Sequence, residues 1–159
     1  VAFLSSASIL SYGIGPICLL ALRKIQPEQR RPFKLLGSLF FCNIAFYVCN
    51  LMLYWCGFSV IWKLCLAILF GFIIYLCYQK RNFWSGNYSL YWFFSYITVL
   101  LLLSYLGPFG GIARLKFPFG MLIIFPFSLL MLYLSQYCLV RDQAEKESFD
   151  LMNKQLQDL

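Results

Sequence analysis

The chain has 159 residues, of which 62% are hydrophobic and only 12% are charged, and its net charge is +7. An average soluble domain carries about 25% charged residues, and a soluble chain of this length could not keep so many apolar side chains away from water. The basic residues lie in short clusters between long uncharged runs, which argues against a nucleic-acid-binding surface. We therefore expect a membrane protein without a nucleic-acid partner.

Five apolar segments follow one another along the chain, and each is close to the ~20 residues that cross the hydrocarbon core of a bilayer as a helix. None alternates polar and apolar residues as barrel strands do, and a helix satisfies its own backbone hydrogen bonds in lipid. We predict an all-α transmembrane region over residues 1–140 and a tail over 141–159. The predicted spans are about 1–22, 35–55, 60–78, 90–106 and 119–140.

The distribution of Lys and Arg predicts the direction in which these spans cross. If the spans alternate, the loops after the first and third spans and the tail lie on one side. That side carries ten basic residues and the other side carries three, so the positive-inside rule places it, with the C-terminus, in the cytoplasm. The first loop anchors this topology, and its basic side chains can also meet anionic lipid headgroups. They are Arg23, Lys24, Arg30, Arg31 and Lys34.

The tail places Phe149, Met152, Leu156 and Leu159 at helical spacing, which predicts a short amphipathic helix. We expect it to lie on the membrane surface or on the protein, and a binding site for a partner is the alternative.

The first span is the most polar of the five. Ser5, Ser8 and Tyr12 are three and four residues apart, so they share one face of a helix. We predict that this face lines a water-filled pathway, and serine hydroxyls bonded back to the helix backbone are the alternative. Ala7, Ser11 and Gly15 form a neighbouring face of small residues, for which close packing of another helix is the favoured interpretation.

A kink is predicted near the middle of the same span. Pro16 has no backbone N–H, so the Tyr12 carbonyl loses its helical donor, and the flanking Gly13 and Gly15 weaken the helix further. Transporters place interrupted helices around their substrate at this depth.

Other polar groups in the spans point to packing rather than to chemistry. Asn43 and Asn50 are seven residues apart in the second span, and we predict that they bond to neighbouring helices. The chain has no histidine, its seven cysteines form no CxxC pair, and no Asp or Glu lies in a span. We therefore predict no metal site, no cofactor and no catalytic residues, and we expect the protein not to be an enzyme.

Three stretches, in order, resemble amino-acid permeases. Residues 11–35 read SYGIGPICLLALRKIQPEQRRPFKL, with a small-Gly-Pro step, an A-L-R helix exit, and P-E and R-P-F pairs. Residues 50–64 read NLMLYWCGFSVIWKL, and SYLGPFGG at 104–111 is followed by FPFG at 117–120. Together they resemble the tenth to fourteenth helices of amino acid–polyamine–organocation (APC) superfamily permeases, in the branch similar to bacterial aspartate:proton symporters.

The resemblance implies an inverted-repeat transporter fold and a secondary transporter that moves an amino acid by proton symport or exchange. It implies that the first span is the last helix of the second repeat and that the other four are peripheral. Only the first span would then line the substrate pathway, with Ser5, Ser8 and Tyr12 as substrate contacts or gate residues. The apolar run at Val1 has no charged n-region and no small-residue cleavage site, so we do not expect a signal peptide there. We expect the chain to be the C-terminal part of the permease, in a bacterial inner membrane. The missing N-terminal helices would be its partners. The alternative is a non-transporting membrane subunit from a truncated gene.

Overall fold

The computed structural model describes all residues except 1, 29, 31–36, 79–87, 116–117 and 158–159, and it leaves aside the side chains of 78, 146 and 149–157. The described part folds into five helices, each with a stretch long and apolar enough to cross a membrane. They are α1 (Ala2–Ile25), α2 (Ser38–Cys56), α3 (Phe58–Tyr78), α4 (Tyr88–Leu106) and α5 (Phe119–Gln157). The predicted fold class, an all-α membrane protein with about five spans, is confirmed.

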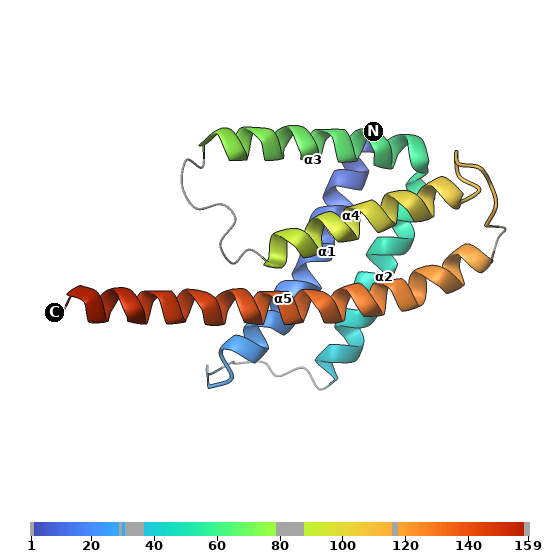
Figure 1. Ribbon diagram of the computed structural model, residues 1–159. Coiled ribbons are helices and arrows are strands. Elements are labelled where there is room, and N and C mark those ends of the chain that lie inside the picture. Colours follow the sequence, from blue (N-terminus) through green and yellow to red (C-terminus); the bar gives the residue numbers. More distant parts are fainter. Residues whose placement is uncertain (1, 29, 31–36, 79–87, 116–117, 158–159) are drawn as a thin grey trace.

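The helices form two layers that cross obliquely (Figure 1). In one layer α3, α4 and α5 lie side by side, with α4 in contact with both neighbours. In the other layer α1 and α2 pack against each other and cross behind the first, and α1 contacts both α3 and α5. The layers share one core, in which Phe46, Leu53 and Ile61 are almost completely buried.

The ends of the helices define two ends of the bundle. α1 and α3 finish, and α4 begins, at the end where α5 continues into the tail (Figure 1). We call this the basic end, because Arg23, Lys24 and Arg141 belong to the helix segments there. α5 runs through residue 140 to Gln157 without interruption, so the segment after the fifth span is helical and continuous with that span.

A single glycine connects α2 to α3 at the opposite end. Gly57 has φ 85°, a conformation that favours glycine, and a Cβ there would lie 2.9 Å from the carbonyl oxygen of Phe109. The Phe58 N–H donates to the same oxygen at 2.9 Å. The turn after α4 is therefore seated on the elbow between α2 and α3.

The ring of Tyr54 fills the space between two further glycines at this end. A Cβ at Gly120 would lie 2.4 Å from the Tyr54 hydroxyl oxygen, and a Cβ at Gly107 would lie 2.8 Å from the same atom. Non-bonded atoms repel each other at these separations, so an added Cβ would force its tightly packed neighbours to shift. Glycine at both positions lets the start of α5 and the end of α4 close over α2.

The Gly120→Ala variant is expected to unfold more easily, by about 1–3 kcal/mol, because the new methyl group overpacks this site. Tyr54→Phe removes the oxygen that the methyl group meets, so the double variant should recover part of the loss. Thermal unfolding in detergent measures the effect, with Gly71→Ala as control because a Cβ at Gly71 meets nothing within 4 Å. An equal loss in the single and double variants would contradict the steric explanation.

Three polar side chains connect α2, α4 and α5 inside the bundle. Asn50 is 1% exposed, and its Nδ2 donates to the Ser128 hydroxyl at 3.1 Å and to the Phe46 carbonyl at 3.0 Å. The Tyr96 hydroxyl donates to Asn50 Oδ1 at 2.6 Å. Asn43 donates instead to the Leu39 carbonyl of its own helix, at 2.9 Å. Within the described part of the chain, the predicted interhelical role is confirmed for Asn50 and wrong for Asn43.

Replacing Asn50 with Ala is expected to lower the free energy of unfolding by about 1–3 kcal/mol, because the buried Tyr96 and Ser128 hydroxyls each lose a partner. Asn43→Ala is the matched control, since it removes the same amide from the same helix and breaks only a bond within one turn. Unfolding of both variants in detergent provides the comparison. Equal losses of unfolding free energy in Asn50→Ala and Asn43→Ala would show that the hydrogen bonds of Asn50 to Tyr96 and Ser128 do not stabilise the bundle.

Candidate functional site

The sequence-predicted site lies on α1, and the packing of α1 determines which of its faces stay open. One face, with Ser6, Gly13, Ile17, Leu20 and Ala21, is buried. This is the side on which α1 contacts α2, α3 and α5. The opposite side of α1 has no described helix packed against it, and we call it the open face.

Ser5, Ser8 and Tyr12 all lie on this open face and are exposed. Tyr12 is 72% exposed. The Ser8 hydroxyl donates to the Leu4 carbonyl of its own helix at 3.1 Å, which is how a hydroxyl in a membrane helix satisfies itself when no partner helix is present. The three side chains form one continuous polar strip that no other described helix covers.

The predicted kink residues are divided between the two faces. α1 continues as a helix through Pro16, and the missing N–H of Pro16 removes the helical donor for the Tyr12 carbonyl. Gly13 is buried, with a Cβ position 3.8 Å from Cys49 Cβ and 3.9 Å from the Phe46 ring. Nothing lies within 4 Å of the Cβ position of Gly15. Close packing of α1 within this chain therefore occurs at Gly13.

The predicted small-residue face does not serve that packing here. Ala7 is half-buried, whereas Ser11 and Gly15 are exposed beside the Tyr12 strip. In the described chain, the side of α1 that includes Ser8, Ser11, Tyr12 and Gly15 therefore has no helix against it.

The half of α1 after Pro16 is held to the rest of the bundle by polar contacts. Gln136 of α5 is buried, and its Nε2 donates to the Ile17 carbonyl at 3.0 Å. Arg23 donates to the Ser38 hydroxyl at the start of α2. Sequence reasoning did not identify Gln136. The signal was present in the spacing of Ser128, Ser135 and Gln136, which places polar groups on one face of the last span.

The basic residues of the first loop are only partly described. Arg23 is half-buried by its contact with Ser38, and Lys24 and Arg30 are exposed. Arg31 and Lys34 lie outside the described residues. The predicted topological role of this cluster stays a prediction.

A second unpredicted residue, Asp142, caps α4 at the basic end. Its carboxylate accepts hydrogen bonds from the N–H of Tyr88 at 2.8 Å and of Ser89 at 2.9 Å, and from the Ser89 hydroxyl. The first N–H groups of a helix have no partner within the helix, and a carboxylate there also complements the helix dipole. The Arg141 guanidinium lies 4.3 Å from the centre of the Tyr88 ring. α5 thereby fixes the start of α4.

Asp142→Ala is expected to increase hydrogen exchange at the Tyr88 and Ser89 amides by about fivefold, because loss of a helix cap costs ~1 kcal/mol. Hydrogen–deuterium exchange with mass spectrometry of the protein in detergent measures this. The control is Glu147→Ala, which removes an exposed carboxylate from the same helix. Unchanged exchange at the start of α4 would contradict the capping role.

The five long apolar helices define this chain as the helical region of a multi-pass membrane protein, and one face of α1 is polar and exposed. No protein-family model matches the sequence, and no solved structure matches it. The sequence does match two characterised proteins of Bacillus subtilis (strain 168). The chain is 31% identical to the glutamate/serine transporter AimA over 133 residues, which cover 80% of the chain and 25% of the relative. It is 31% identical to the aspartate-proton symporter over 145 residues, which cover 84% of the chain and 27% of the relative.

These matches confirm the resemblance to amino-acid permeases that the motif at 11–35 indicated. They extend over most of this chain, whereas the chain spans about a quarter of the length of each relative. The chain is related to amino-acid transporters and is an integral, multi-pass membrane protein by its five apolar helices.

Proposed function

We propose that this chain is the C-terminal part of a secondary transporter that moves an amino acid across the membrane by proton symport or exchange. The observation that carries the proposal is the 31% identity to two amino-acid transporters over 80% and 84% of the chain. We also propose that the protein is a transporter and not an enzyme. A non-transporting subunit has no observation of its own in its favour.

Within this transporter, Ser5, Ser8 and Tyr12 are proposed to line the substrate pathway or its gate. Their hydroxyls form an uncovered strip on α1 (Ala2–Ile25), and the chain spans only about a quarter of its relatives. Further helices of the same protein would complete the other wall. Hydroxyls and an aromatic ring suit the polar and apolar parts of an amino acid. Gly13, Gly15 and Pro16 are proposed to let α1 bend beside this strip.

The proposed orientation places the basic end and the C-terminus in the cytoplasm of a bacterium, with the protein in the inner membrane. Arg23, Lys24 and Arg30 at that end support it. The five spans predicted from the sequence contain no Asp, Glu or His, so a proton-coupling carboxylate is proposed to lie in another part of the transporter. Glutamate, serine or aspartate, which the names of the relatives mention, are the substrates to test first.

Uptake of radiolabelled amino acids into proteoliposomes, with and without a pH gradient, tests the function of the protein that contains this chain. We expect uptake of at least one amino acid, and uptake that a pH gradient drives would identify symport. Absence of uptake for every amino acid would contradict transport.

Tyr12→Ala is expected to lower uptake about tenfold, because loss of one substrate hydrogen bond in the transport cycle is worth ~1.4 kcal/mol. Tyr133→Ala is the matched control, since Tyr133 of α5 is 70% exposed and Tyr12 is 72% exposed. The control should transport at a rate close to that of the unmodified protein. Unchanged uptake by Tyr12→Ala would contradict the pathway role of this face without contradicting transport.

A further inference from the structure

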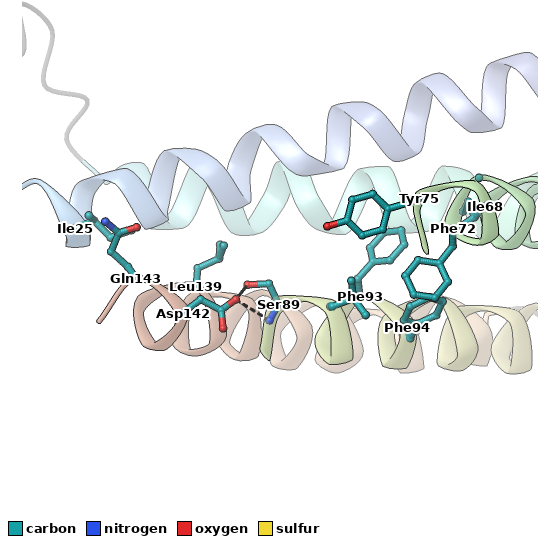
Figure 2. A pocket seen from close by; sticks show the side chains of 12 residues that line it. Ile25, Ile68, Phe72, Tyr75, Ser89, Phe93, Phe94, Leu139, Asp142 and Gln143 are labelled. Carbon is teal, nitrogen blue, oxygen red and sulfur yellow. Dashed lines mark hydrogen bonds between the residues drawn. The ribbon is translucent and has the colours of Figure 1, made fainter. Parts of the chain in front are cut away.

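A groove of about 680 Å³ opens at the basic end, between the end of α1 and the layer of α3, α4 and α5. Figure 2 shows that its lining changes character along its length. The apolar part comprises Ile68, Phe72, Phe93 and Phe94. The polar part comprises Ser89, Asp142 and Gln143. We call this hollow the basic-end groove. Its volume lies within the range of ~300–1,000 Å³ typical of ligand sites.

The apolar part of the groove lies within the spans and has room for a flexible chain. Phe72 and Phe94 meet edge to face, with ring centres 4.7 Å apart, and form one wall. Gly71 also lines the groove, and nothing lies within 4 Å of its Cβ position. When α3 and α4 span a bilayer, this part of the groove would lie at the level of the hydrocarbon core. Its occupant should therefore be an aliphatic chain.

The polar part of the groove is suited to an anionic headgroup. The Asp142 carboxylate, the acidic group of the lining, is already engaged by two N–H groups and the hydroxyl at the start of α4. Arg141 is the next residue of α5, is exposed and rests on the Tyr88 ring. Lys24, also exposed, precedes the lining residue Ile25. Arg141 and Lys24 are thus sequence neighbours of lining residues at the polar end of the groove, and Glu145 lies close enough to Arg141 to interact with it electrostatically.

We propose that the basic-end groove binds an anionic phospholipid, with one acyl chain between α3 and α4 and the phosphate near Arg141 and Lys24. The two halves of the groove match the two halves of this molecule, and charge complementarity favours an anionic over a zwitterionic headgroup. The proposal depends on membrane insertion of α3 to α5 and does not depend on transport.

Photo-crosslinking tests the site on the protein that contains this chain, reconstituted in phosphatidylcholine vesicles. The probe is phosphatidylglycerol with a diazirine near the end of one acyl chain, and mass spectrometry locates the labelled residues. Labels should concentrate at the lining residues Ile68, Phe72, Phe93 and Phe94 of the unmodified protein. Labelling of these residues no stronger than that of Phe70 and Ile74, which lie on the exposed face of α3 outside the lining, would overturn the proposal.

Gly71→Leu fills the groove and should lower this labelling about tenfold, since losing the burial of about two methylene groups changes an affinity by that factor. Ala67→Leu is the control, because it adds an apolar side chain to an exposed position of α3 outside the lining. Equal labelling in Gly71→Leu and the control would overturn the acyl-chain site.

The headgroup is tested with the same diazirine on phosphatidylcholine. This probe should label the groove several-fold less than phosphatidylglycerol does, and Arg141→Gln should reduce the difference, whereas Arg30→Gln should not. Equal labelling by the two probes in the unmodified protein would overturn the anionic assignment.

Discussion

Burying an amide side chain inside a membrane bundle is costly unless the amide is paired within the protein, and the arrangement of these five helices depends on that constraint. Asn50 meets it by joining α2 to α4 and α5 through Tyr96 and Ser128. Apolar contacts between helices in lipid do not by themselves favour association, because lipid tails offer similar contacts. The buried amide therefore supplies the directional interaction that sets how the two layers meet.

The same constraint operates at the basic end in a different form. There the start of α4 has free N–H groups, and Asp142 of α5 accepts hydrogen bonds from two of them. Gln136, further back on α5, donates to the carbonyl of Ile17 on α1. α5 thus supplies polar partners to α2, α4 and α1 in turn. Together with the close contact at Gly120, these bonds hold α1, α2 and α4 to α5.

Much of the fold could be predicted because length and hydropathy are read directly from the sequence. The five apolar helices follow from runs that are long enough to cross a bilayer, and the interhelical bond of Asn50 follows from the cost of burying an unpaired amide. The roles of Gln136 and Asp142 could not be predicted, because they depend on which helices become neighbours and at what height. Asn43 shows the same limit, since an amide with equal chemistry bonds to its own helix when no neighbour reaches it.

The strip of Ser5, Ser8 and Tyr12 was predictable as a pattern, because spacing alone places three residues on one face. Whether another helix covers this strip was not predictable, because that depends on which helices pack against the opposite side of α1. The packing of Gly13 against α2 leaves that strip uncovered. Its role in transport stays a prediction.

The unbroken length of α5 has a mechanical consequence. At ~1.5 Å per residue its 39 residues extend over about 58 Å, and its internal proline, Pro126, precedes both Gln136 and Asp142. From Pro126 onward, no flexible joint separates the tail from the residues that grip α1 and α4. A force applied to the tail near Gln157 would therefore be transmitted along one continuous helix to Asp142 and Gln136, and through them to α4 and α1.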